Sequence, residues 1–158
     1  MDIQVASNFE RLLFGLYNGK GDLVKKAMHK LSQEGAFKLT VQALNILKED
    51  FFSGTASEGM TRETIKKTLV EFGELICPHT SVGLTVANEL RETNNSETMV
   101  TLGTAHPAKF PDSVKASTGI TPILPDRYKD LYLRKEVFLS SKNNFSGIKE
   151  IISERTSV

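Results

Sequence analysis

Apolar residues in the first half of the chain recur at the spacing of a helix. Phe9, Leu12, Leu13 and Leu16 stand at positions i, i+3, i+4 and i+7, so one helical face carries all four. The same spacing returns in three later segments, at 24–31, 41–51 and 65–72. The pattern therefore predicts four amphipathic helices before residue 74.

Residues that favour helix ends flank these segments. Gly35 and Gly73 follow two of them, and glycine readily adopts the left-handed conformation that closes a helix. Thr40 and Thr61 precede two others, where a hydroxyl can accept a hydrogen bond from a free amide of the first turn. We therefore expect Thr40 and Thr61 to open the third and fourth helices.

The second half mixes helical patterns with two short β-rich runs. Helical spacing is expected around 82–90, 107–118, 128–133 and 145–152. The pattern instead predicts two short strands. One is residues 98–102, followed by Gly103, and the other is Val137-Phe138-Leu139. Two isolated strands leave unpaired backbone groups along their edges. This favours the interpretation that the chain is a piece of a larger protein. The expected class is α/β, mostly helical with a few short strands.

Composition narrows the class of protein. The 158 residues are 39% hydrophobic and 25% charged, which is ordinary for a globular domain. Lys and Arg number 20 against 19 Asp and Glu, without a strongly basic run, so nucleic acid is not an expected partner. The start shows no secretory pattern and no apolar run is long enough for a membrane span, so we expect a cytoplasmic protein.

Metal and disulfide chemistry is also disfavoured. Cys77 is the single cysteine, which excludes an internal disulfide and a zinc site built on paired cysteines. The three histidines, His29, His79 and His106, lack the spacing of metal ligands, so no metal is predicted. Residues 15–21 resemble a phosphate-binding loop but have one residue too few between the glycines and no Ser or Thr after Lys20.

The most reactive side chains cluster in residues 101–110. A predicted strand ends at Gly103, Thr104, His106 and Lys109 follow within six residues, and Pro107 suits the first turn of a helix. Ligands of α/β proteins bind beyond strand ends and beside helix starts, so these side chains are candidates for a polar or phosphorylated ligand. The alternative is structural: Thr104 caps the helix, His106 is half-buried packing and Lys109 is a solvated surface residue.

Two further polar turns precede helices. In residues 78–83, Thr80 or Ser81 can serve as a helix cap or contact a ligand. In residues 7–11, Ser7 and Glu10 fit a capping box, and Asn8 beside them can also meet a ligand.

Three segments together resemble bacterial threonine synthases. Residues 1–14, which include Ser-Asn-Phe-Glu-Arg-Leu-Leu-Phe, are similar to the part that follows the phosphate loop of that family. Residues 78–83, Pro-His-Thr-Ser-Val-Gly, resemble its Pro-His-Thr-Ala-Val-Gly motif. Residues 104–111, Thr-Ala-His-Pro-Ala-Lys-Phe-Pro, resemble a third family motif. The order and approximate spacing agree along nearly the whole chain.

The resemblance implies an enzyme that uses pyridoxal 5′-phosphate and has the fold-type II architecture of the tryptophan synthase β chain. Such enzymes convert O-phospho-L-homoserine and water to L-threonine and phosphate. The resemblance implies cofactor contacts for Thr104, which matches the hydroxyl facing the pyridine nitrogen, and for His106. It implies substrate contacts for Lys109 and Asn8.

The resemblance also predicts what residues 1–158 do not provide. None of their lysines stands in the family's Schiff-base lysine motif, and its glycine-rich cofactor-phosphate loop is missing as well. We therefore expect residues 1–158 to be a single C-terminal portion that is inactive without an upstream, lysine-bearing part. Cys77 and Gly103 depart from the family pattern, which more often has aspartate and alanine there. The alternative hypothesis is a non-catalytic helical interaction module left after loss of the catalytic half.

Overall fold

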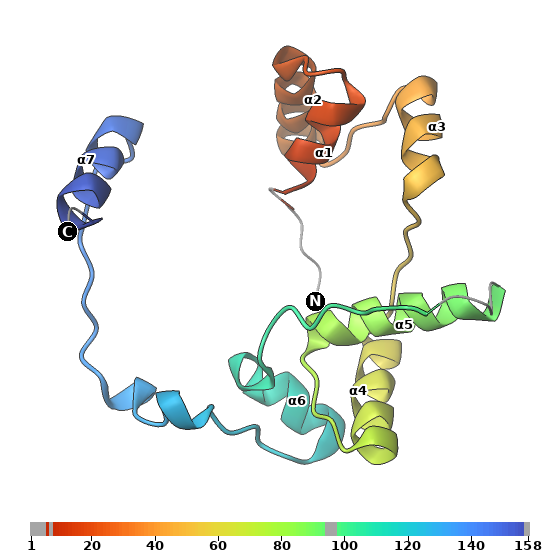
Figure 1. Ribbon diagram of the computed structural model, residues 1–158, viewed down its shortest axis with the longest axis vertical. Helices are drawn as coiled ribbons and strands as arrows, with labels where there is room; N and C mark the ends of the chain where they lie inside the picture. The colour runs from red at the N-terminus through yellow and green to blue at the C-terminus, as the bar shows by residue number, and fades with distance from the viewer. Residues whose placement is uncertain (1–5, 7, 94–97, 157–158) are drawn as a thin grey trace. The chain divides into compact units, whose positions relative to one another are not determined.

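All regular secondary structure in the part of the chain that the structure describes is helical. The structure is a computed structural model that describes residues 6, 8–93 and 98–156 (Figure 1). The helices are α1 (Phe9–Leu16), α2 (Gly21–Glu34), α3 (Val41–Asp50), α4 (Glu58–Phe72), α5 (Pro78–Thr93), α6 (Pro111–Thr118) and α7 (Phe145–Thr156). Three short 3₁₀ turns are η1 (Pro107–Lys109), η2 (Asp126–Tyr128) and η3 (Leu131–Leu133). The chain divides into two compact units, Met1–Ile123 and Leu124–Val158.

Local signals placed most helix ends correctly. Gly35 and Gly73 close α2 and α4 in the left-handed conformation, with φ values of 74° and 72°. Thr40 opens α3, because its hydroxyl accepts a hydrogen bond from the amide of Ala43 at 3.2 Å. The expectation for Thr61 is wrong: Ser57 caps α4, which begins one turn earlier, and Thr61 is buried within the helix.

The best-packed part of the first unit is formed by α4, α5 and α6. Helix α4 contacts both α5 and α6, and the side chains of Ile65, Cys77 and Val114 are fully buried. Hydroxyl groups join α4 to α5: Ser81 Oγ donates to the carbonyl of Thr61 at 2.7 Å. Because each buried hydroxyl has a partner, the small side chains allow close helix packing without unsatisfied polar groups.

The prediction of two strands is wrong in both segments, which the structure describes from residue 98 onward. Strand pairing is absent from segments 98–103 and Val137–Leu139. Their apolar side chains are not buried either: at least three-quarters of the surface is exposed for Val100, Leu102 and Phe138. A strand needs a neighbouring strand to pair its backbone hydrogen-bonding groups, and neither segment has such a neighbour among the described residues. The mostly helical character is confirmed, whereas the described residues form no sheet that would make the class α/β.

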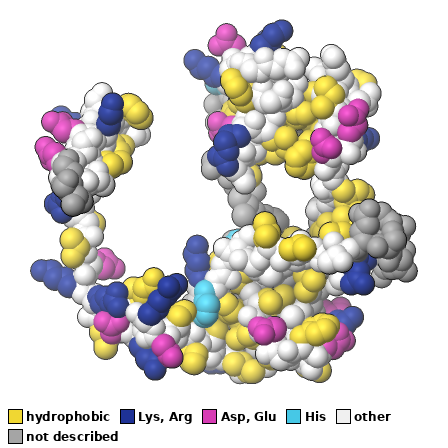
Figure 2. All heavy atoms as spheres, viewed as in Figure 1, with side chains coloured by type: hydrophobic (Ala, Val, Ile, Leu, Met, Phe, Trp, Pro, Cys, Tyr) yellow, Lys and Arg dark blue, Asp and Glu magenta, His cyan; other side chains and the backbone are white. Residues whose placement is uncertain are grey.

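Large apolar side chains remain uncovered in both units. Figure 2 shows hydrophobic side chains at the surface over several helices. In the second unit, none of the described residues is buried, and Leu133, Val137 and Phe145 are each more than 80% exposed. A unit of 35 residues without a core has little to hold it in one conformation by itself. None of the described helices is long and apolar enough to cross a membrane.

Candidate functional site

The polar turn predicted at residues 101–110 is anchored at its C-terminal end. Within η1, the side chain of Ala108 is only 5% exposed, and η1 contacts α6. The backbone closes tightly, because the amide of Lys109 donates to the carbonyl of His106 at 3.0 Å and that of Phe110 to Pro107 at 2.9 Å. The turn is therefore held by its backbone and by one buried methyl group.

An aromatic contact joins this turn to the start of α5. The rings of His79 and Phe110 meet edge to face, with centroids 4.8 Å apart and planes at 70°. Such T-shaped pairs place the positive edge of one ring against the negative face of the other. The motifs at 78–83 and 104–111, distant in sequence, are thus neighbours in space.

The segment before the turn lies along α5. A Cβ atom on Gly83 would come within 3.5 Å of the Thr101 methyl group, which is ordinary van der Waals contact. Figure 1 shows this segment running back beside α5 towards η1. The segment that leads to the turn therefore passes next to Gly83 of α5, at a distance that would still admit a Cβ atom.

The structure places Thr104, His106 and Lys109 on one exposed turn. All three side chains are accessible to solvent. His106 Nδ1 accepts a hydrogen bond from the Ala108 amide at 3.2 Å, which leaves Nε2 as the nitrogen that can donate. Lys109 Nζ lies 5.8 Å from the centroid of the Phe110 ring, within the range of a cation–π contact. The turn thus presents a hydroxyl, an imidazole N–H donor and an ammonium group.

The structural alternative for this turn receives only partial support. His106, and not Thr104, provides the cap, and its side chain is exposed instead of half-buried. Lys109 is solvated, as that alternative expected. Asn8 lies elsewhere, directly before α1, a helix that packs against α2 and α3. Its side chain is exposed and does not cap the helix, and the capping partner proposed for Glu10, Ser7, lies outside the described residues.

The sequence pattern did not indicate that Cys77, directly before α5, accepts a hydrogen bond from the first turn of that helix. Neither Thr80 nor Ser81 caps this helix; the Thr80 amide donates to Cys77 Sγ at 3.4 Å instead. Ser81 is fully buried and bonds to α4. The position of Cys77 directly before a proline was the available signal, because proline favours the first turn and the residue before it is the natural cap.

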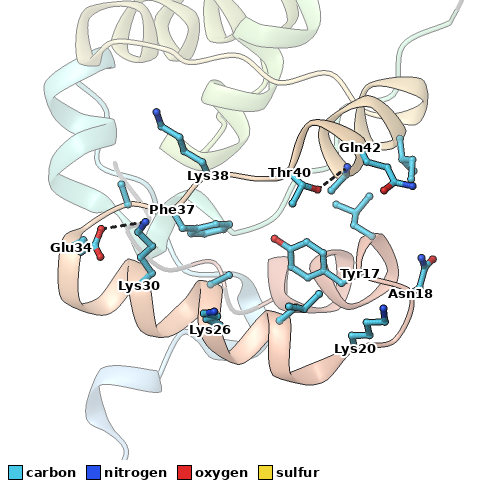
Figure 3. Close-up of a pocket in the computed structure, with 16 residues that line it drawn as sticks. Tyr17, Asn18, Lys20, Lys26, Lys30, Glu34, Phe37, Lys38, Thr40 and Gln42 are labelled. Atoms are coloured by element: carbon cyan, nitrogen blue, oxygen red, sulfur yellow. Dashed lines mark hydrogen bonds and ion pairs between the residues drawn. The ribbon is translucent and has the colours of Figure 1, made fainter.

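A separate cavity of about 570 Å³ lies among α1, α2 and α3 (Figure 3). None of the four predicted site residues lines it. Its walls combine aromatic and aliphatic side chains with several lysines. The sequence indicated only part of this cavity, through the glycine-rich turn at 15–21.

Comparison with known proteins finds similarity to threonine synthases in both sequence and structure. The family model described as "Threonine synthase, C-terminal" matches residues 80–152. The crystal structure of threonine synthase from Brucella melitensis with bound PLP covers 100% of this chain, with a TM-score of 0.70 and 37% identity. The structure of threonine synthase from yeast covers 86% of the chain, with a TM-score of 0.66 and 31% identity.

Curated relatives show the same similarity in sequence. Threonine synthase from Pseudomonas aeruginosa is 39% identical over 155 residues, which are 98% of this chain and 33% of that protein. Threonine synthase from Saccharomyces cerevisiae is 32% identical over 98% of this chain and 34% of its own length. The chain thus spans about a third of the length of the curated relatives it matches. It is similar to threonine synthases along nearly its whole length, and residues 80–152 match the model of their C-terminal region.

Proposed function

We propose that residues 1–158 act as one C-terminal portion of an enzyme that converts O-phospho-L-homoserine and water to L-threonine and phosphate. The supporting observation is the His79–Phe110 contact, which brings two threonine synthase motifs together in a chain similar to these enzymes over 98% of its length. The enzyme would have the fold-type II architecture and work in the cytoplasm.

The residues of the exposed turn fit pyridoxal 5′-phosphate as cofactor. When bound, this cofactor would withdraw electrons from the substrate carbon skeleton. The Thr104 hydroxyl is exposed on an anchored turn, and a neutral hydroxyl can hydrogen-bond to a pyridine nitrogen without forcing its protonation. His106 Nε2, left free by the bond that Nδ1 accepts, supplies a second donor for the cofactor.

Charge on the same turn suits a phosphorylated substrate. The Lys109 ammonium group lies near the Phe110 ring and exposed to solvent, where it can attract a phosphate dianion. Asn8 precedes a different helix, and its exposed amide offers both a donor and an acceptor to the substrate. We assign Lys109 and Asn8 to substrate binding.

The covalent anchor of the cofactor would lie in a part of the enzyme beyond residues 1–158. The relatives are about three times as long as the segment matched here, so most of their length has no counterpart in this chain. That missing part is the partner these residues require, and the uncovered apolar side chains of both units are consistent with it. The isolated chain would not turn over substrate.

The test is to express the chain joined to its natural upstream region and to measure phosphate release from O-phosphohomoserine. We expect release by the joined protein loaded with pyridoxal phosphate and none by residues 1–158 alone. Phosphate release by residues 1–158 alone would refute the assignment of the covalent lysine to another region. A folded, cofactor-loaded joined protein that releases no phosphate would refute the proposed activity.

A further inference from the structure

The cavity among α1, α2 and α3 has an apolar centre. The rings of Tyr17 and Phe37, both half-buried, lie across its middle in Figure 3. Aliphatic side chains complete the walls: Leu16, Leu23, Ala27, Ala43 and Ile46. A volume of about 570 Å³ falls in the range of pockets that hold small organic molecules.

The charged lining of this cavity is strongly unbalanced. Four lysines line it, Lys20, Lys26, Lys30 and Lys38, against the single carboxylate of Glu34. Lys30 and Glu34 form an ion pair at 3.6 Å, so the pair is neutral and three positive charges remain. The whole chain has a net charge of only +1, which makes the excess a local feature of this cavity. An anion is the ligand that such a lining attracts.

The backbone of the glycine-rich turn does not bind the anion itself. The amide of Asn18 donates to the Gly15 carbonyl at 3.0 Å, that of Gly19 to Phe14 at 2.8 Å and that of Lys20 to Tyr17 at 3.2 Å. A phosphate-binding loop needs free amides, so this turn is not one. Its left-handed residues, Asn18 and Gly19, reverse the chain and bring Lys20 to the cavity. These three amides are therefore not available to an anion, and the lysine side chains of the lining are the charged groups that can attract one.

From these observations we propose that this cavity binds a small organic anion, with an aromatic or otherwise flat apolar body between Tyr17 and Phe37. The anionic group, a carboxylate or a phosphate monoester, would be held at the rim by Lys20 and Lys26, for which the described residues show no ion-pair partner. Lys38 extends away from the other labelled side chains in Figure 3 and is not assigned to the ligand. The site is separate from the turn that carries Thr104.

Phenyl phosphate is a suitable probe because it combines the two required features. Titration into the labelled 158-residue chain, followed by two-dimensional NMR, should give saturable shifts in the backbone signals of residues 16–46 at millimolar concentration. Inorganic phosphate lacks the apolar body and benzyl alcohol lacks the charge, so each should bind at least about tenfold more weakly. Inorganic phosphate that binds as tightly as phenyl phosphate would overturn the proposal.

Matched double variants test the role of the two lysines. Lys20→Gln with Lys26→Gln should weaken phenyl phosphate binding about tenfold, the effect of two exposed ionic contacts. Lys25→Gln with Lys48→Gln removes the same charge from α2 and α3 outside the cavity and should change the affinity less than about twofold. Equal losses in the two double variants, or no saturable shift of wild type up to about 10 mM, would overturn the proposal.

A neutral substitution tests the apolar centre. Tyr17→Ala should weaken phenyl phosphate binding while leaving inorganic phosphate unaffected, because it removes ring contact and no charge. Circular dichroism of each variant establishes that the helices persist. If a variant loses helicity, Tyr17→Leu provides the replacement, since it keeps an apolar side chain and loses only the flat ring. Unchanged phenyl phosphate affinity in a folded variant would refute the assigned position of the ligand.

Discussion

The imidazole of His79 packs edge to face against the ring of Phe110, with centroids 4.8 Å apart. His79 belongs to the first turn of α5, and Phe110 links η1 to α6. One aromatic pair therefore connects the helix start at 78–83 to the turn that presents Thr104 and Lys109. We expect this contact to stabilise the turn as well as the helix packing.

A double-mutant cycle measures this contact. Phe110→Ala and His79→Ala should each lower the free energy of unfolding, and their coupling energy should be about 0.5–1.5 kcal/mol, as for other aromatic pairs. Urea unfolding of the four proteins gives the value. Phe145→Ala is a suitable control, because Phe145 is 82% exposed and its loss should cost less than about 0.5 kcal/mol. Strictly additive effects would show that the rings do not interact.

Gly54 is predicted to be intolerant of a side chain. A Cβ atom there would lie 2.8 Å from Val86 Cγ1, and valine in a helix has little rotamer freedom to move away. Gly54→Ala should destabilise the chain by about 1–3 kcal/mol in thermal unfolding. Gly59→Ala in α4 meets nothing closer than 3.8 Å and should stabilise slightly. Val86→Ala should restore the stability lost by Gly54→Ala; failure to do so would contradict the clash.

The thiol of Cys77 should react slowly in the folded chain. It is fully buried at the start of α5, and it is the single cysteine, so a thiol reagent reports on this position alone. Reaction with dithiobis-nitrobenzoate should be roughly 100-fold slower than in denaturant. As a control, Cys77→Ser combined with Ser32→Cys moves the thiol to an exposed position of α2, where it should react rapidly. Fast reaction of Cys77 without denaturant would mean that α5 is not packed as described.

The carboxyl group of Asp130 should titrate at an unusually low pH. Arg134 donates to it twice, at 2.9 and 2.7 Å, and this hydrogen bonding lowers the pKa of Asp130 from its ordinary value. The pKa of Asp130 is lower in the folded chain than in the unfolded chain. The ion pair therefore contributes its full stability above the unfolded pKa, and that stability is lost as the pH falls through the folded pKa.

Carboxyl NMR of the chain measures this pKa directly. Arg134→Gln should return the pKa of Asp130 towards its ordinary value. Lys129→Gln, which removes the neighbouring ion pair with Asp126, should leave it low. High salt should reduce the difference, since both side chains are solvent-exposed. An unchanged titration in Arg134→Gln would show that this pair does not form.

Thr104→Ala should weaken catalysis in the joined protein while sparing the fold. The side chain is exposed in this chain, so its loss removes no packing, whereas loss of one hydrogen bond to the cofactor should lower activity about tenfold. Thr104→Ser should retain most activity. Thr121→Ala removes another exposed hydroxyl, outside the turn, and it should behave as wild type. Full activity of Thr104→Ala would remove the role assigned to it.

Features set by neighbouring residues could be predicted from the sequence. The glycine ends of α2 and α4 and the threonine cap of α3 depend on φ angles and hydrogen bonds within a few residues. Features that depend on distant segments could not. Thr61 was predicted to cap α4. The hydroxyl of Ser57 caps this helix instead, and Thr61 is buried within it, where its carbonyl accepts a hydrogen bond from Ser81 of α5. The candidate turn was found from its residue types, whereas its attachment to α5 through His79 was not.

The sequence by itself determined the helical segments, most of their ends and the similarity to threonine synthases, because periodicity, capping and motif order are all readable along one chain. Tertiary structure decided that 98–102 and 137–139 are unpaired here, that Cys77 is buried directly before α5 and that a cavity rich in lysine lies beside the turn at 15–21. A strand requires a partner strand, and a cavity requires helices brought together from separate parts of the chain. Neither strand pairing nor the approach of separate helices can be predicted from the residues of one segment alone.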